Sequence, residues 1–302
     1  MANKWQREVQ RLEKATDKQT QAELYKVYND LLIDLQKNIR EYVDEFDNLP
    51  AYRKAQLYNL DQLQQQVIDI INDKQPMAEA VILDHETKSM VDGYYHDIYQ
   101  VEETNGLRID FSPLDNRVIA ETVNHPVDMN LLSERLYNQR KELAERTNHL
   151  LATKLAQGKS YAQIAKDIKE STEASFYQAN RIARTEGGRV RSIAKLKAQD
   201  ELISKGIDIE KMWLATLDTR TRNSHGAMDG QTVAVDEKFE SPEGHTTDAP
   251  RLFQVAEEDI NCRCSMATIV KGYPPMSRRY DNKTGDFITY KEWQKIHNLA
   301  LD

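Results

Sequence analysis

The first hundred residues carry the hydrophobic pattern of long amphipathic helices. Between Ala22 and Phe46, apolar residues recur at intervals of three and four, which places them along one side of a helix. We expect this helix to stop at Asn48-Leu49-Pro50, because proline disfavours a helical conformation in the residue before it. The apolar stripe consists of Leu24, Val27, Tyr28, Leu31, Leu35, Ile39 and Val43.

Two more helices are expected in this region. The first extends through Leu57 to Asp73. The second begins after Pro76 and ends at Asn105, where Gly106 can adopt the left-handed conformation that closes a helix. Together these segments predict an antiparallel bundle of long helices, in which we find no motif that indicates chemistry.

The middle of the chain continues the helical pattern. Residues 111–130 contain two prolines and indicate a connector with one short helix. A helix is then expected from Ser133 to Gly158. Ser160 is a suitable N-terminal cap for a short helix over Tyr161–Lys169, and a longer helix is expected over Thr172–Lys205.

After residue 210 the pattern changes to short runs of β-branched and aromatic residues, separated by Gly, Pro, Asp and Asn. Lys211–Leu217, Gln231–Val235 and Cys264–Val270 are the expected strands. The chain is therefore predicted to be an α+β protein, with a long-helix region followed by a small C-terminal domain in which a long helix packs on a short sheet. The expected division is residues 1–130 for the helical region, 131–270 for the small domain and 271–302 for a tail with a short helix.

Composition narrows the class of protein. Of the 302 residues, 39% are hydrophobic and 30% are charged, as in soluble, helix-rich proteins. The formal charge of −8 makes a free-standing DNA-binding factor an unattractive interpretation. No stretch approaches the roughly 18 apolar residues of a membrane span, and the N-terminus lacks the apolar core of a signal peptide. Two cysteines separated by one residue form no disulfide framework, so we expect synthesis in a reducing cytosol.

Residues that carry chemistry are concentrated between Trp213 and Cys264. This stretch contains the pattern W-x4-D-x-R-T-R-x-x-H-x-x-x-D-G-Q and ends in N-C-R-C. The block Arg184-Thr185-Glu186 precedes it on an expected helix. Three blocks in this order resemble the C-terminal domain of the Mu F-like head morphogenesis proteins, which are minor head proteins of tailed bacteriophages. The resemblance covers about residues 160–270.

The resemblance implies a minor capsid protein that is made in the host cytoplasm and ends inside the phage head. Such proteins associate with the portal protein, and with capsid or scaffolding proteins, during head assembly. Contact with packaged double-stranded DNA, or help in its ejection, is a further implied task. The resemblance implies no enzyme activity and a structural role for the motif. The residues that match the family pattern are Arg184, Thr185, Glu186, Trp213, Asp218, Arg220, Thr221, Arg222, His225, Asp229, Gly230, Cys262, Arg263 and Cys264.

Cys262, Cys264 and His225 form a candidate zinc site, because thiolates and imidazole suit zinc in tetrahedral geometry. On an extended strand the two cysteines share a face. Asp218 is a candidate fourth ligand, and His245 is a weaker candidate than His225 because it lies outside the family pattern. The cysteine spacing departs from the C-x2-C knuckle, so the alternative of two small buried thiols beside a hydrogen-bonding histidine stays open.

The loop around His225 also contains residues of the kinds found in active sites. A histidine near carboxylates can act as an acid or a base, and arginines can hold a phosphate. A metal-dependent hydrolase or a toxin-like enzyme that uses this loop is therefore the alternative function. Against it, the sequence lacks a nucleophile elbow, an H-E-x-x-H motif and a glycine-rich phosphate loop.

The helix around residue 190 is the most basic segment of this acidic chain. Arg189, Arg191, Lys195 and Lys197 have spacings that bring side chains together on a helix, and they are candidate contacts to DNA. The alternative is a solvated face. For the inner residues we expect an ion-pair network that packs the helix on the sheet, made of Arg184, Glu186 and Asp218.

Overall fold

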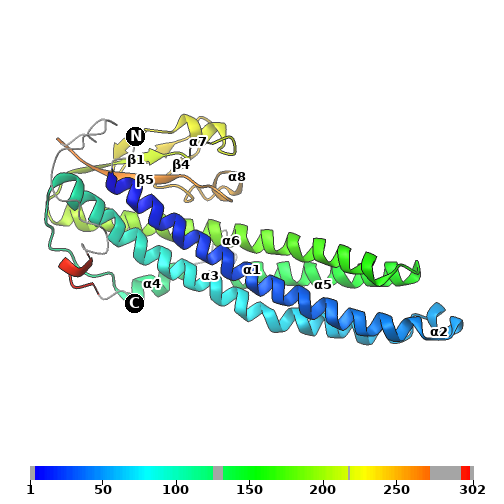
Figure 1. The fold of residues 1–302 in the computed structure, drawn as a ribbon. Coiled ribbons are helices and arrows are strands. Elements are labelled where there is room, and N and C mark those ends of the chain that lie inside the picture. The colour runs from blue at the N-terminus through cyan, green and yellow to red at the C-terminus, as the bar shows by residue number, and fades with distance from the viewer. Residues whose placement is uncertain (1–3, 125–131, 217, 273–293, 300–302) are drawn as a thin grey trace. The chain divides into compact units, whose positions relative to one another are not determined.

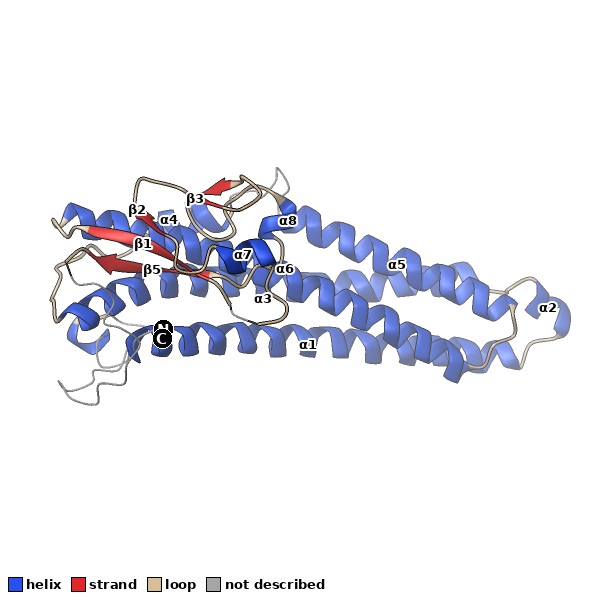
Figure 2. Ribbon diagram, turned by 90° about the horizontal axis from the view of Figure 1, so that it is seen from above, coloured by secondary structure: helices blue, strands red, loops and turns tan. Residues whose placement is uncertain are grey.

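The computed structural model describes residues 4–124, 132–216, 218–272 and 294–299 (Figure 1). Long helices precede short strands along the chain, which confirms the predicted α+β class (Figure 2). The helices are α1 (Lys4–Asp47), α2 (Ala51–Ala55), α3 (Leu60–Asn105), α4 (Asn116–Val123), α5 (Leu132–Ala156), α6 (Tyr161–Ser204), α7 (Asn223–Ala227) and α8 (Ala256–Asp259). The strands are β1 (Ile209–Leu214), β2 (Thr232–Ala234), β3 (Phe239–Glu240), β4 (Thr246–Thr247) and β5 (Ser265–Val270). No helix in the described part of the chain combines the length and apolar character needed to span a bilayer.

The predicted apolar stripe of α1 forms part of a core. All of its members are buried except Val27, which is partly buried. The helix ends at Asp47, where we predicted a stop, but it begins at Lys4, much earlier than expected. Gly158 and Gly206 follow α5 and α6 with positive φ angles of 65° and 80°, as the predicted helix ends require.

Two predicted breaks are wrong, because the helices continue through them. Helix α3 contains Pro76 in its interior, although proline removes a backbone hydrogen bond and crowds the preceding turn. Ile71 and Ile82, on either side of it, are buried in one apolar core, and this packing offsets the lost bond. Helix α6 runs through the joint predicted near residue 171. There the buried Thr172 hydroxyl donates to the Ile168 carbonyl oxygen (2.9 Å). The polar group of this side chain therefore finds its partner within the helix.

The chain divides into two compact units, which we describe separately. The bundle unit comprises Gln19–Asp84 and Pro126–Ala183. It contains parts of α1, α3 and α6 and the whole of α5, and all four helices contribute side chains to its apolar core. It is therefore a four-helix bundle, in which α5 and α6 join the N-terminal helices that the sequence pattern placed in a bundle.

The sheet unit comprises Met1–Lys18, His85–His125 and Arg184–Asp302. Its three-stranded antiparallel sheet has the order β2-β1-β5 and consists of the three predicted strands. Strands β3 and β4, which we did not predict, form a separate hairpin. Trp213 of β1 pairs with Met266 of β5, and both side chains are buried in a core that contains the two cysteines.

This division differs from the one expected from the sequence, because α1, α3 and α6 each contribute residues to both units. A boundary placed once along the chain cannot separate units that share three helices. Most of the predicted tail lies outside the described residues. Of its expected terminal helix, residues 294–299 are described, and they begin with one helical turn.

The basic segment that we predicted to contact DNA is buried, so that prediction is wrong for most of its residues. Arg189, Arg191 and Lys195 are 5 to 7% exposed. Arg189 pairs with Glu186 (3.0 Å), and Lys195 pairs with Glu13 of α1 (3.1 Å). Spacing within one helix shows which basic residues lie together, but it does not show that acids of a distant segment cover them.

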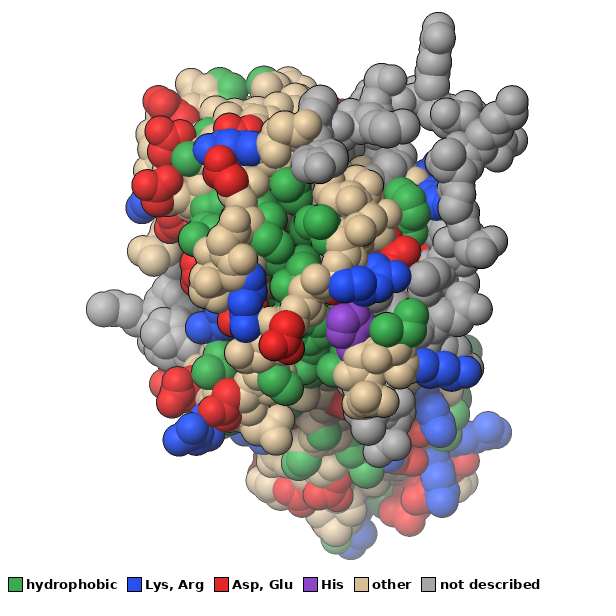
Figure 3. Space-filling model, turned by 90° about the vertical axis from the view of Figure 1, so that its left-hand side faces the viewer, with side chains coloured by type: hydrophobic (Ala, Val, Ile, Leu, Met, Phe, Trp, Pro, Cys, Tyr) green, Lys and Arg blue, Asp and Glu red, His purple; other side chains and the backbone are tan. Residues whose placement is uncertain are grey.

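Of the four predicted DNA contacts, Lys197 is partly exposed. The face of the molecule in Figure 3 mixes Lys and Arg side chains with acidic ones. Binding to phosphates needs a local excess of positive charge. One partly exposed lysine does not supply this excess, so the burial of the other three residues contradicts the predicted DNA contacts.

Buried charges instead connect the elements of the sheet unit. The Arg191 guanidinium is 3.1 Å from the Asp17 carboxylate. The Lys195 ammonium, besides pairing with Glu13, donates to the Ser265 hydroxyl at the start of β5 (2.9 Å). Burial alone would raise the pKa of Glu13, but Lys195 and Arg191 lower it to about 2. The ionised carboxylate therefore helps to hold α1 against α6.

Replacement of the Glu13 carboxylate tests this cluster. Glu13→Gln should lower the free energy of unfolding at neutral pH by about 3–5 kcal/mol, because it leaves buried cations uncompensated. It should also flatten the acid side of the stability curve. A carboxyl group whose pKa falls from 4.5 to about 2 on folding stabilises the fold fully above pH 4.5, and this contribution is lost as the pH falls through that window.

Urea unfolding of the parent and the variant between pH 7 and pH 2 measures both effects. Glu41→Gln is the matched control, because Glu41 is exposed on the same helix. The control should unfold like the parent at every pH. If Glu13→Gln retained the parent's acid dependence, the buried pair would not contribute as described.

A second prediction concerns the close approach of α3 and α6 within the sheet unit. A Cβ atom at Gly93 would lie 2.8 Å from the Arg191 carbonyl oxygen and 2.9 Å from the Ala194 Cβ. Gly93→Ala should therefore destabilise the protein by about 1–3 kcal/mol, although alanine favours a helix over glycine by about 1 kcal/mol. Gly226→Ala in α7 is the control, because a Cβ there meets no atom within 4 Å. Equal denaturant midpoints for the two variants would contradict the close approach.

Candidate functional site

Three predicted metal ligands come together in the sheet unit, and we call them the His–Cys cluster: His225 of α7 and Cys262 and Cys264, which precede β5. Their ligand atoms all lie within 4.8 Å of one another. His225 Nδ1 is 3.5 Å from the Cys262 sulfur and 3.6 Å from the Cys264 sulfur. Each side chain is at most 2% exposed, and both thiols are free. The cluster is thus enclosed by protein.

Glu258 of α8 orients the histidine ring. Its Oε2 is 2.9 Å from His225 Nε2, so this nitrogen carries the proton of the neutral ring and Nδ1 turns a lone pair toward the sulfurs. The other carboxylate oxygen is 3.0 Å from His245 Nδ1 and 3.3 Å from the Ser241 hydroxyl. His245, the weaker candidate ligand, therefore contacts the partner of His225 rather than the sulfurs.

The Cys262 and Cys264 thiols shift each other's pKa. A hydrogen bond from the Cys264 thiol lowers the pKa of Cys262, and the same bond and burial raise the pKa of Cys264. Burial lowers the pKa of His225, but its bonds to Cys262 and Glu258 outweigh this and leave its pKa above the ordinary value. The backbone N–H of Cys264 also points to the Cys262 sulfur (3.4 Å). Cys262 is therefore the sulfur that most readily carries negative charge.

Aromatic rings close the cluster off from solvent. Trp213 meets the His225 ring edge to face, with centroids 5.4 Å apart, and Phe253 stacks on it at 5.9 Å. Phe239 packs on the other side of Trp213. These apolar neighbours lower the local polarity, which strengthens the interactions of any charge inside.

Asp218, the predicted fourth ligand, lies outside the cluster. Its two carboxylate oxygens accept hydrogen bonds from the Arg263 guanidinium at 2.5 and 2.6 Å. The backbone N–H of Arg220 donates to the same carboxylate (3.0 Å). The bond from Arg263 is the main reason that the pKa of Asp218 lies well below its usual range. Asp218 thus stabilises the loop through a salt bridge and is not a metal ligand in this arrangement.

The predicted network of Arg184, Glu186 and Asp218 also does not form. The Arg184 guanidinium instead donates to the Asn261 side chain (2.7 Å). The Thr185 hydroxyl accepts the backbone N–H of Asn261 (3.0 Å). Asn261 has a left-handed φ of 58°, so these two residues of α6 hold a turn directly before the first cysteine. Glu186 faces inward to Arg189 instead.

The remaining motif residues bind the backbone. Arg222 donates to the Ile260 carbonyl oxygen (2.7 Å), and Asp229 accepts the backbone N–H of Ala215 (2.9 Å). Gly230 has a φ of 84°, which favours glycine over any residue with a side chain. The polar side chains of this motif therefore satisfy internal partners, whereas the Arg220 side chain extends into solvent.

Sequence reasoning missed two residues that position the cluster. Glu258 belongs to no recognisable motif and is one of many acids in the chain. Arg251 donates from Nε to the Cys262 carbonyl oxygen (2.8 Å), and it occupies the space beside Gly188 of α6. A glycine in a helix interior costs about 1 kcal/mol relative to alanine, so Gly188 was a signal that something packs closely there.

Comparison with known proteins identifies relatives. The sequence profile of a family described as Phage Mu protein F like protein matches residues 146–267. The chain is 34% identical over 210 residues to the minor head protein GP7 of Bacillus phage SPP1, and the match covers 68% of each chain. It is 39% identical over 294 residues, or 96% of its length, to a protein of Enterococcus faecalis named NAD(+)--arginine ADP-ribosyltransferase EFV. The chain spans 60% of that relative's length. No solved structure matches significantly.

The matched segment contains the features that carry the resemblance seen in the sequence. It includes the Arg184-Thr185-Glu186 block, the loop from Trp213 to Gln231 and both cysteines. The likeness to the SPP1 protein extends beyond this segment to 68% of either chain. The chain therefore belongs to the Mu F-like family of phage minor head proteins.

Proposed function

We propose that the protein binds the portal protein during assembly of a tailed phage head and remains inside the head. Membership of the Mu F-like family supports this proposal, as does the name of the SPP1 relative, a minor head protein. The motif side chains that bind internal partners also support a structural role. From a position beside the portal the protein would assist the delivery of packaged DNA.

The observation that carries the proposed contact is a group of exposed aromatic side chains on the bundle unit. Tyr25 and Tyr177 are 59% and 65% exposed. Phe176 contacts both, with ring centroids at 5.7 and 5.2 Å. Phe176 itself is buried, and we call Tyr25 and Tyr177 the tyrosine surface. Other large apolar side chains exposed on the bundle unit are Ile33, Tyr52, Tyr58, Met77 and Tyr137.

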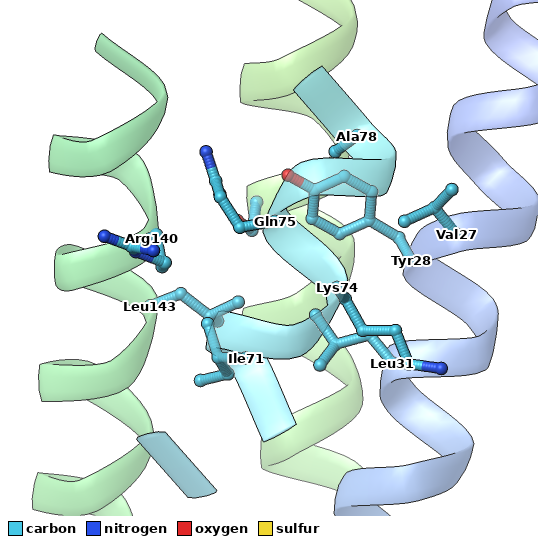
Figure 4. Close-up of a pocket in the computed structure, with 10 residues that line it drawn as sticks. Val27, Tyr28, Leu31, Ile71, Lys74, Gln75, Ala78, Arg140 and Leu143 are labelled. Carbon is cyan, nitrogen blue, oxygen red and sulfur yellow. The ribbon is translucent and has the colours of Figure 1, made fainter. Parts of the chain in front are cut away.

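Tyrosine suits a binding surface, because it offers a large contact area, few rotatable bonds and a polar hydroxyl group. The interior of the bundle has little room for a ligand. A hollow between its helices, with Tyr28 and Arg140 among its walls, has a volume of about 20 Å³ (Figure 4). This is room for about one water molecule. This hollow is therefore too small to hold a ligand.

Sedimentation with portal rings tests the proposal. The purified chain should co-sediment with purified portal protein of the same phage. Combining Tyr25→Ser with Tyr177→Ser should weaken binding by about tenfold or more, because each lost interface tyrosine removes about 1 kcal/mol or more. Ile203→Ser, at a 46% exposed position of the sheet unit, is the control and should bind like the parent. A parent chain that stays in the supernatant would refute portal binding.

A second candidate function is the transfer of ADP-ribose to arginine, which the name of the Enterococcus faecalis relative describes. The identity of 39% over 96% of this chain is the observation in its favour. Because the chain spans 60% of that relative, the shared part need not carry the named activity. The loop with the best assortment of catalytic side chains is closed. His225 is 1% exposed, and its ring nitrogens face Glu258 and the cysteines.

We therefore expect no transferase activity from this chain. Incubation with NAD⁺ and an arginine-containing acceptor protein should give no ADP-ribosylarginine by mass spectrometry. A known arginine ADP-ribosyltransferase under the same conditions is the positive control. Formation of the modified arginine above the level without enzyme would make the protein an enzyme and remove the argument for a purely structural role.

A further inference from the structure

We infer that the His–Cys cluster binds one zinc ion that fastens the C-terminal part of the sheet unit. Zinc lies about 2.3 Å from thiolate sulfur and about 2.0–2.1 Å from imidazole nitrogen in tetrahedral sites, which places nitrogen and sulfur about 3.6 Å apart. The separations from His225 Nδ1 to the Cys262 and Cys264 sulfurs are 3.5 and 3.6 Å. The one lone pair of Nδ1 accepts one S–H donor, which accounts for one of these contacts. A shared ion accounts for both.

The orientation of the ring gives a second, independent argument. Glu258 accepts a hydrogen bond from Nε2 of His225, which turns the Nδ1 lone pair toward two electron-rich sulfurs. Once the thiols lose their protons, these converging lone pairs repel one another unless a cation lies between them. A carboxylate behind a histidine is also the usual arrangement around zinc, because it fixes the ring and makes the ligand nitrogen more basic.

The carboxylate is itself held in place. The Ser241 hydroxyl and His245 contact the oxygen of Glu258 that does not face His225. A chain of contacts therefore leads from the surface to the sulfurs through His245, Ser241, Glu258 and His225. The side chain of His245 is 34% exposed, whereas that of Glu258 is 4% exposed. A histidine that merely filled the core would not need an acid held by two further partners.

The donor set selects the metal. Two thiolates and one imidazole are borderline-soft ligands, which suit zinc and exclude calcium and magnesium, since those ions require oxygen ligands. Three protein ligands leave one tetrahedral position for a water molecule. Trp213 packs against His225, and within the described residues its indole N–H has no hydrogen-bond acceptor. A buried N–H without a partner indicates an acceptor that the protein itself does not supply.

The ion would join three segments that are far apart in sequence: α7 with His225, α8 through Glu258, and the turn that leads into β5. Around them lies a small apolar core, and small cores commonly need a metal or a disulfide for stability. One coordination position is left to water, but the three ligands are at most 2% exposed, so no substrate reaches the ion and we assign it a structural role. This inference does not rest on the proposed portal binding, since it concerns the isolated chain.

Metal analysis of the full chain tests the inference. Protein produced with zinc and purified without chelator should contain about one equivalent of zinc, and a chelator should lower its melting temperature. Replacement of zinc by Co²⁺ should give thiolate-to-cobalt charge-transfer absorption. The visible d–d bands of the bound Co²⁺ should have the intensity of a tetrahedral site. Cys264→Ser should lose both the metal and the absorption. A parent chain that contains no zinc, takes up no Co²⁺ and melts unchanged with chelator would overturn the inference.

A milder variant covers the case in which Cys264→Ser fails to fold. Glu258→Gln keeps all three ligands but weakens the hold on His225, and it should reduce the affinity for Co²⁺ by about 10–100-fold. Glu257→Gln is the matched control, because the neighbouring Glu257 is exposed, and it should bind Co²⁺ like the parent. Equal affinities of the two variants would show that Glu258 does not support a metal ligand.

Discussion

The sheet unit depends on one buried contact, the ion pair between Glu13 of α1 and Lys195 of α6. The two groups are 3.1 Å apart and almost without exposure. Burial of two charges is costly, and the loss of either leaves the other uncompensated. Lys195 also donates to the Ser265 hydroxyl and the Met266 carbonyl oxygen, which extends the contact to β5. A buried ion pair tolerates few other arrangements of the groups around it. The Glu13–Lys195 pair therefore fixes the register of α1, near the N-terminus, against β5, late in the chain.

The same helix also positions the His–Cys cluster. Gly188 lies two turns before Lys195 and leaves space for the side chain of Arg251. The Arg251 guanidinium donates to the Cys262 carbonyl oxygen (2.8 Å) and to the Gly188 carbonyl oxygen (3.3 Å). One turn earlier still, Arg184 binds Asn261, directly before the cysteines. Helix α6 therefore carries both the buried charges and the contacts that set the sulfurs opposite His225. This explains why a block of residues on a helix and a distant pair of cysteines belong to one motif.

The limits of prediction from sequence follow from the range of the interactions. Periodicity within a segment predicted the buried stripe of α1, and residue type predicted that Cys262 and Cys264 lie beside a histidine, although both precede β5 and neither lies on the strand itself. Contacts between distant segments were not predictable in this way. Glu258 has no local signal, and the burial of Lys195 requires an acid from another helix. Pro76 failed as a helix breaker because tertiary packing outweighed a local preference.

The two units use their polar and apolar residues in opposite ways. In the sheet unit, polar motif residues such as Asp218 and Arg222 turn to internal partners, whereas the bundle unit exposes large aromatic residues such as Tyr177. Motif side chains that bond to other groups of the same protein stabilise a fold but specify no reaction. The same scaffold can therefore occur in a minor head protein and in a longer protein named for enzymatic activity, as the two relatives of this chain illustrate. What distinguishes such proteins must lie in the surfaces they expose and in the segments joined to them.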